Sequence, residues 1–143
     1  MPPELTFEEV VYRVYRGPVL AAEGTAGRAS FRRDTGDVAG RDVVARFPGR
    51  RDSAEVAATQ VDGNVAMRRF VASGGLHAEQ GGEVADTERA SYDAADGLVR
   101  GDRLVTVRGG GFVATGAGFT LDPHEERVRL EGGAHVVAGG ARR

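Results

Sequence analysis

The chain has 143 residues, which is long enough for one domain that buries roughly two-thirds of the surface exposed by its unfolded form. A hydrophobic content of 41% and a net charge of −2 indicate an ordered globular protein and give no sign of a nucleic-acid partner. The absence of cysteine excludes disulfides, thiolate metal sites and a cysteine nucleophile.

The N-terminal segment predicts a β-strand followed by a turn. Residues 5–16 alternate in parity and are rich in β-branched and aromatic side chains. Gly17-Pro18 ends this strand because proline has no backbone N–H for a ladder. A second strand is expected to begin at Val19.

The next segment predicts two hairpin turns. Asp34-Thr35-Gly36 is a turn signal before a strand expected over residues 38–47. Asp62-Gly63-Asn64 is a second turn signal, between strands expected over residues 55–61 and 65–72.

Glycine clusters divide the remainder of the chain into short runs, such as those around Gly74-Gly75, Gly109-Gly110-Gly111 and Gly132-Gly133. These runs are too short and too often interrupted for stable helices. Alternating strands with frequent turns predict an all-β, antiparallel sandwich, barrel or jelly roll.

The sequence also contains an internal repeat. Residues 29–44 return as residues 90–105, and residues 72–82 return as residues 130–140. The order indicates one supersecondary unit of about sixty residues used twice. Such a sheet leaves unpaired strands at its two ends unless it closes on itself.

Three motifs together resemble a known family. The first is the opening segment, residues 5–17, and the second is the repeated pattern of Ala-x-aromatic, a turn and Gly-x-Val-x-Gly. The third is Phe119-Thr-Leu121-Asp122 followed by Val128-x-Leu130-x-Gly132. The chain resembles the LptC/LptA (OstA-like) periplasmic lipopolysaccharide-transport proteins, most closely the LptC members. The resemblance implies a twisted antiparallel β-jelly-roll built from two similar units and open at the edges. It implies a single domain over residues 1–143, with repeats over about 5–82 and 83–140.

The resemblance also implies a function without catalysis, cofactor or metal. The protein is expected to bind lipopolysaccharide acyl chains in an apolar groove. It would pass them through a periplasmic protein bridge, from an inner-membrane ABC transporter to the next soluble bridge protein, in outer membrane biogenesis. LptC-type proteins usually carry an N-terminal membrane anchor. Since no stretch here approaches about 18 apolar residues, we expect that an anchor was removed.

The predicted lipid groove is formed by large apolar side chains with small residues between them. These are Phe31, Phe70, Tyr92, Leu104, Phe112, Phe119, Leu121 and Leu130. The alternative, that these side chains simply fill a core, stays open from the sequence. By resemblance, the segment containing Phe7, Val11 and Tyr15 would face the transporter, and the segment containing Val128 and Val136 would face the bridge protein, through β-augmentation. Ordinary terminal strands protected by charges are the alternative.

Other functions remain possible at this stage. A structural β-repeat scaffold would polymerise through its edge strands and have a packed interior without a ligand. A carbohydrate-binding or enzymatic jelly roll is disfavoured because the chain has no tryptophan and three tyrosines. His77 and His135 occupy matching repeat positions without a second ligand at a suitable spacing, so no metal site is predicted. The pairs Arg32-Arg33, Arg50-Arg51 and Arg68-Arg69 either hold lipid phosphates or belong to solvated surfaces.

Overall fold

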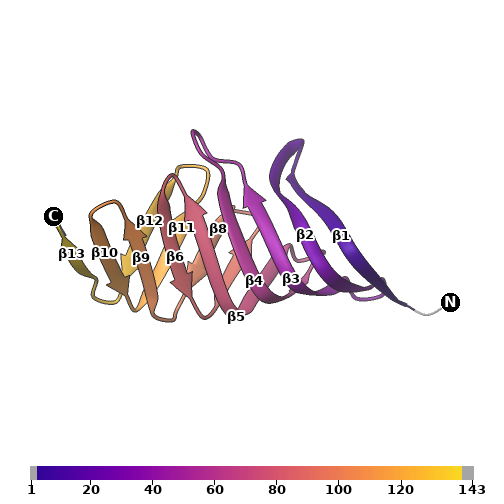
Figure 1. Cartoon of the computed structure of the whole chain (residues 1–143). Helices are drawn as coiled ribbons and strands as arrows, with labels where there is room; N and C mark the ends of the chain where they lie inside the picture. Colours follow the sequence, from indigo (N-terminus) through magenta and orange to yellow (C-terminus); the bar gives the residue numbers. More distant parts are fainter. Residues whose placement is uncertain (1–2, 140–143) are drawn as a thin grey trace.

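The computed structural model describes residues 3–139, and over this range it consists of strands and turns without a helix (Figure 1). The ends of the predicted domain, residues 1–2 and 140–143, lie outside the described residues. The strands are β1 (Glu4–Arg16), β2 (Val19–Arg32), β3 (Asp37–Phe47), β4 (Ala54–Asn64), β5 (Arg69–Gln80), β6 (Glu83–Thr87), β7 (Ala90–Asp93), β8 (Leu98–Gly101), β9 (Val105–Gly109), β10 (Phe112–Gly116), β11 (Gly118–Asp122), β12 (Arg127–Glu131) and β13 (His135–Ala138).

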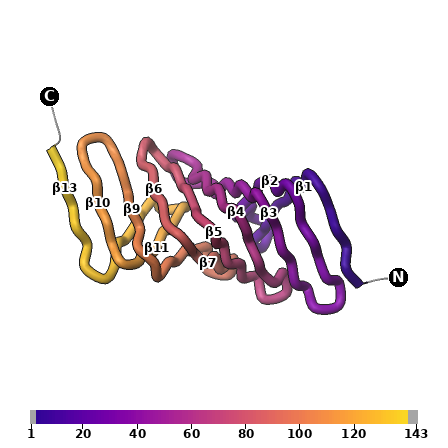
Figure 2. The backbone as a smooth tube through the Cα atoms, turned by 60° about the horizontal axis from the view of Figure 1, so that its bottom comes forward, coloured from indigo at the N-terminus to yellow at the C-terminus, as the bar shows by residue number. Residues whose placement is uncertain are grey.

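These strands form an antiparallel meander folded into two layers. Strand β5 is shared, because its Leu76–Gln80 part pairs with β6 and its Arg69–Ala72 part pairs with β7. Layer A continues from β6 through β9 and β10 to β13, and layer B continues from β7 through β8 and β11 to β12. Strands β1 to β4 run through both layers, and the two chain ends lie at opposite ends of the molecule (Figures 1 and 2). The predicted all-β fold with open edges is thereby confirmed.

The sheet bends from one layer into the other along an irregular line across the long strands, which we call the fold line. The pairing register skips Glu9, Gly27 and Asp42, which lie opposite one another on β1, β2 and β3. Glu9 and Asp42 both have a φ of 53°, in the left-handed region. The line continues to Gly74-Gly75 on β5, where φ is 80° and 101°. Positive φ values re-aim an extended chain, so β1, β3 and β5 change direction at this line.

Directly opposed residues of an antiparallel sheet share a face, which identifies the inward positions. One inward row crosses the whole of layer B and contains apolar residues and one glycine. In order from β1 to β12 it is Leu5, Phe31, Val38, Gly63, Phe70, Tyr92, Val99, Leu121 and Val128. The facing row of layer A, from β1 to β13, is Tyr12, Gly24, Ala45, Val56, Ala78, Ala85, Val107, Ala114 and Val136.

The two copies of the first repeat motif form equivalent hairpins in layer B. Phe31 is opposite Val38 in the first copy, and Tyr92 is opposite Val99 in the second. In each turn a glycine N–H donates to the carbonyl four residues earlier at 2.8 Å. The repeated sequence therefore specifies the same register twice.

One predicted turn lies elsewhere. The structure continues β4 through Asp62-Gly63-Asn64 and turns at residues 65–68. Gly63 is opposite Phe70, and a Cβ on Gly63 would stand 2.4 Å from Phe70 Cδ1. The glycine therefore makes room for an aromatic ring across the strand instead of bending the chain. Asn64 Oδ1 accepts a hydrogen bond from the N–H of Met67 at 2.9 Å and caps the true turn.

Candidate functional site

An apolar cavity lies between the layers in the N-terminal half of the molecule. Its volume is about 340 Å³, and it is enclosed by β1 to β5 together with β7 and β8. Most of its wall consists of alanine and valine at inward positions, with a few aromatic rings. The aromatic side chains of the wall are Phe7, Tyr12, Phe31, Phe47, Phe70 and Tyr92.

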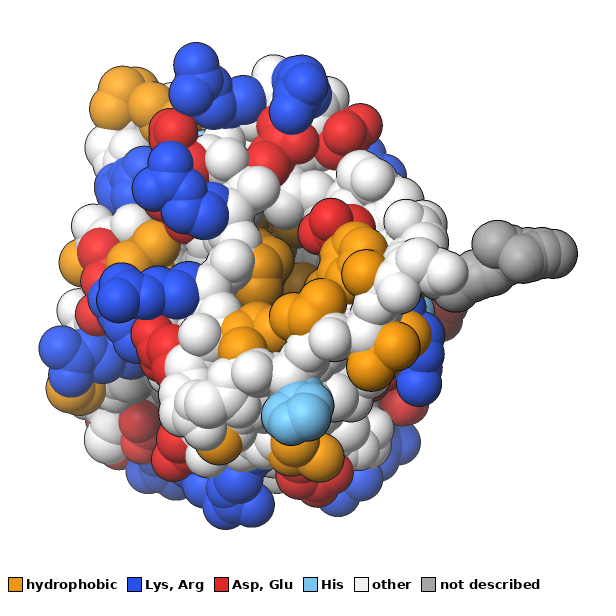
Figure 3. All heavy atoms as spheres, turned by 90° about the vertical axis from the view of Figure 1, so that its left-hand side faces the viewer, with side chains coloured by type: hydrophobic (Ala, Val, Ile, Leu, Met, Phe, Trp, Pro, Cys, Tyr) orange, Lys and Arg blue, Asp and Glu red, His pale blue; other side chains and the backbone are white. Residues whose placement is uncertain are grey.

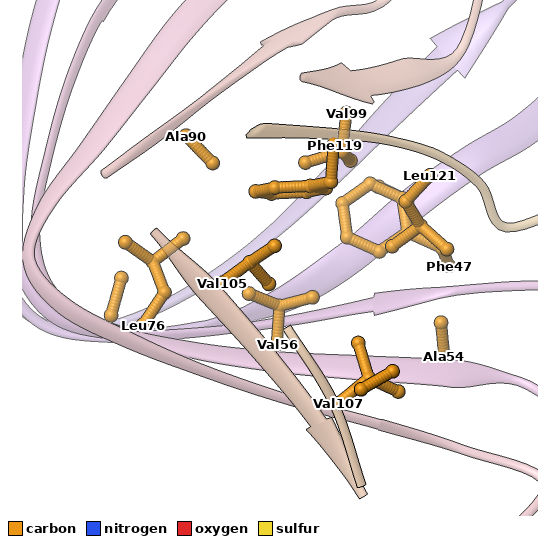
Figure 4. Packing of buried hydrophobic residues seen from close by; sticks show 13 residues of the cluster. Phe47, Ala54, Val56, Leu76, Ala90, Val99, Val105, Val107, Phe119 and Leu121 are labelled. Carbon is orange, nitrogen blue, oxygen red and sulfur yellow. The ribbon is translucent and has the colours of Figure 1, made fainter. Parts of the chain in front are cut away.

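Between this cavity and the open C-terminal end, the centre of the interior is filled by side chains. Val105, Val107, Phe119 and Leu121 are buried in one cluster with residues of β3, β4 and β5 (Figure 4). Phe47, only 5% exposed, belongs both to this cluster and to the cavity wall. Its ring meets that of Tyr92 edge to face, with centroids 5.0 Å apart. These two rings mark the boundary between the cavity and the packed cluster.

The structure divides the predicted groove residues into four groups. Phe31, Phe70 and Tyr92 line the cavity. Phe119 and Leu121 are buried in the packed cluster. Phe112 and Leu130 pack against that cluster, and Leu104 is 69% exposed on the outer surface, in a shallow depression that also contains His77.

Sequence reasoning missed the small side chains that form most of the cavity wall, such as Ala26, Val43 and Ala58. Val43 faces the cavity, whereas Val44 lies in the depression on the outer surface. The alternation of inward and outward positions along β2, β3 and β4 is the signal that identifies these residues.

The five predicted edge residues all lie on strands that have one neighbour only. On β1, Phe7 lines the cavity, whereas Val11 and Tyr15 are 68% and 52% exposed. At the other end, Val128 and Val136 occupy inward rows but are 39% and 60% exposed, because no further strand covers them. Figure 3 shows this end hollowed at its centre, with apolar side chains inside.

Along the side opposite the fold line, the layers meet through their hairpin tips. We call this line of polar contacts the seam. Arg68 Nη2 donates to the carbonyl of Tyr15 at 2.7 Å. Further along, Gln80 Nε2 donates to the carbonyl of Pro123 at 3.1 Å, and Arg50 forms an ion pair with Glu125 at 3.1 Å. Side chains and loops, not a β-ladder, therefore close the interior on this side.

Two tyrosines project into the cavity with different hydrogen bonding. The Tyr12 hydroxyl donates a hydrogen bond to the carbonyl of Val44 at 3.0 Å. Gly24 leaves room for this hydroxyl, because a Cβ at that position would stand 2.7 Å from the hydroxyl oxygen. Burial raises the pKa of Tyr12 to about 12. The buried hydroxyl of Tyr92 has no hydrogen-bond partner among the described residues. Burial also raises the pKa of Tyr92, and the charges of Arg16 and Arg68 act against that rise.

Among the predicted phosphate-binding arginines, Arg32, Arg50 and Arg69 have carboxylate partners. Arg32 pairs with Asp34 at 2.9 Å, and Arg69 pairs with Asp93 at 3.4 Å. Arg50 is paired across the seam, as described above.

The histidines of the repeat lie apart, on β5 and β13. His77 Nδ1 is 2.8 Å from Asp86 Oδ1, and this hydrogen bond raises the pKa of His77. Within residues 3–139, no group of three or more histidine, aspartate and glutamate side chains is placed to hold a metal ion.

Fold and interior together define an open-ended, all-β protein with an apolar interior. The family model of lipopolysaccharide-assembly, LptC-related proteins matches residues 56–138, and the chain belongs to this family. The predicted family is thereby confirmed.

The fold is similar to that of a crystal structure of LptH, the LptA homologous periplasmic component of the conserved lipopolysaccharide transport device from Pseudomonas aeruginosa. The TM-score is 0.56 at 12% identity, covering 95% of this chain and 94% of that one. No curated protein matches the sequence. The described part of the chain contains no helix capable of crossing a membrane.

Proposed function

We propose that this protein carries lipopolysaccharide by its acyl chains, without catalysis, as part of a periplasmic bridge. The observation that carries the proposal is the apolar cavity of about 340 Å³ in a member of a lipopolysaccharide-assembly family. Acyl chains leave water for such an interior without needing specific polar partners, because the gain scales with apolar area. A wall of alanine and valine leaves the space that several methylene groups need.

The bridge is formed through the two open edges. Strand β1 receives the inner-membrane transporter, and β12 and β13 receive the soluble bridge protein. Unpaired backbone groups on these strands can extend the sheet by β-augmentation. The inward positions Val128 and Val136 would then be covered by the partner, so that its interior continues that of this chain. The protein acts in the periplasm, associated with the inner membrane through its partner or through an anchor.

The test is saturable uptake of lipid, with a matched pair of variants. Purified protein is titrated with lipid A and, separately, with an apolar fluorophore. Val43→Phe places an added ring in the cavity, and Val44→Phe places the same ring on the outer surface one residue along. We expect Val43→Phe to abolish uptake and Val44→Phe to retain it. Equal uptake by both variants, or none by the wild-type protein, would refute the carrier proposal and favour a scaffold without a ligand.

A further inference from the structure

We propose that the seam beside Tyr92 binds the anionic head group of an amphiphile, between Arg16 and Arg68, while the apolar chain lies in the cavity. The head group carries an oxyanion, either a carboxylate or a phosphate monoester. This inference rests on the proposed lipid-carrier function, and it assigns a polar recognition site to a cavity with a mostly apolar wall.

The first observation is the unpartnered hydroxyl. Buried polar atoms in native proteins nearly always have a hydrogen-bond partner, because leaving one unpaired is unfavourable. Tyr12 follows this rule in the same cavity through its bond to Val44. The Tyr92 hydroxyl does not, although its ring is fixed by Phe47 and by stacking on Phe70 at 6.3 Å. A ligand oxygen placed at this hydroxyl would complete its hydrogen bonding.

The second observation is positive charge without a carboxylate partner. Arg16 and Arg68 are each only partly exposed, and both charges act on the ionisation of Tyr92. The Arg68 carbonyl accepts a hydrogen bond from the N–H of Ala94 at 2.8 Å, which places Arg68 beside the hairpin that carries Tyr92. Among the described residues no carboxylate lies within 4.0 Å of either guanidinium. Arg68 donates to the Tyr15 carbonyl, and Arg16 lies against Gly97, where a Cβ would stand 2.8 Å from Arg16 Nη1.

The acidic groups in this region do not cancel that charge. Asp93 and Asp96 also act on Tyr92, but each has its own arginine. Asp93 pairs with Arg69 at 3.4 Å, and Asp96 pairs with Arg100 at 2.7 Å. Two guanidinium groups without a carboxylate partner among the described residues therefore act on Tyr92.

The chemistry of these groups selects the ligand. A guanidinium group is a donor without acceptor capacity, and burial keeps the Tyr92 hydroxyl protonated and able to donate. All three groups can therefore donate to one acceptor, and the charge favours an oxyanion with several oxygens. The cavity wall next to them requires that this oxyanion be attached to an apolar chain. A neutral alcohol or a cationic head group would leave the arginines unpaired.

The experiment compares two probes that share one chain. Dodecyl phosphate and 1-dodecanol, each below its micelle-forming concentration, displace an apolar fluorophore from the protein. We expect dodecyl phosphate to bind the wild-type protein at least about tenfold more tightly than dodecanol, as expected for charge-assisted hydrogen bonds. Inorganic phosphate, followed by calorimetry, is expected to bind about a hundredfold more weakly than dodecyl phosphate. Equal affinity would indicate a free-phosphate site and contradict the amphiphile assignment.

Variants locate the head group. Arg16→Gln should lower the affinity for dodecyl phosphate about tenfold, and Tyr92→Phe, which keeps the ring, should lower it several-fold. Neither should change the affinity for dodecanol. Arg103→Gln is the control, since Arg103 carries the same charge on an exposed side chain and pairs with Asp102 at 3.7 Å, and neither residue lines the cavity.

Unchanged binding of dodecyl phosphate by Arg16→Gln and Tyr92→Phe, with normal thermal unfolding, would overturn the proposed site and leave the carrier function intact. Failure of both probes to displace the fluorophore from the wild-type protein would instead contradict the carrier function on which the site depends.

Discussion

The two halves of the interior share one topology but differ in side-chain volume. In the inward row next to the fold line of layer B, three of the five N-terminal strands contribute a small residue, and the last two C-terminal strands contribute large ones. In order from β1 to β12 the row is Phe7, Ala29, Gly40, Val61, Ala72, Ala90, Gly101, Phe119 and Leu130. The first half contains the cavity, whereas the second half contains the Phe119 and Leu121 side chains of the packed cluster, with the open hollow of Figure 3 at its end. The comparison shows that an antiparallel meander sets the distance between the layers, while residue size at equivalent positions decides whether the space is empty or filled.

The largest expected effect is a difference in the free energy of unfolding between a variant of the packed cluster and a variant of the cavity wall. Phe119→Ala removes a ring that is 7% exposed from the packed cluster and should lower the free energy of unfolding by about 3–5 kcal/mol. Phe31→Ala removes the same atoms from the wall of the existing cavity and should cost only about 1 kcal/mol, since the ring is partly exposed. Urea unfolding of both variants measures the difference. Equal losses would mean that the cavity collapses around Phe31 and that the two halves are packed alike.

A smaller effect tests how the cavity wall is held. Tyr12→Phe removes the hydroxyl bond to the Val44 carbonyl and should lower the free energy of unfolding by about 1 kcal/mol at neutral pH. The pKa of Tyr12 is raised from 10.0 to about 12 in the folded state. Its contribution to stability is therefore complete below pH 10 and lost as the pH rises through 12. The free energy of unfolding, measured from below pH 10 up to about pH 12, should show this decline in the wild-type protein and a weaker one in Tyr12→Phe.

The smallest expected effect is a pH-dependent change in stability from the pair of His77 on β5 and Asp86 on β6. The hydrogen bond to Asp86 raises the pKa of His77 above 6.5, so its contribution is present below that value and lost as the pH rises through the folded pKa. Because His77 is half exposed, the contribution should be below about 1 kcal/mol. His77→Gln should remove this part of the difference in stability between mildly acidic and mildly alkaline pH. A wild-type profile identical to that of the variant would show that the pair adds nothing at this junction.

Much of the fold could be predicted from the sequence because strands and hairpin turns are local signals. The repeated hairpins of Phe31 and Tyr92 follow directly from the alternating pattern and the glycine turns. The role of Gly63 could not be predicted in this way, since its requirement comes from Phe70 on another strand.

The candidate site was less predictable because it depends on how the layers face each other. Large apolar residues were expected to line one continuous groove, but sequence does not reveal that Phe119 packs into a cluster while Phe31 borders empty space. The same limit applies to the arginines. Arg68 and Arg69 are equivalent in sequence, and only the structure pairs Arg69 with Asp93 and turns Arg68 toward Tyr15.

The way the seam is closed has a mechanical consequence. Every β-ladder of the described residues runs within a layer or across the fold line, so spreading the hairpin tips apart breaks none of them. The contacts that must be released, such as Arg50 with Glu125 and Gln80 with Pro123, are partly solvated and individually worth about 1 kcal/mol or less. Separating the layers at the hairpin tips would thus leave every strand folded, and its main cost would be the packing of Val105 and Val107 against Phe119 and Leu121 between the layers.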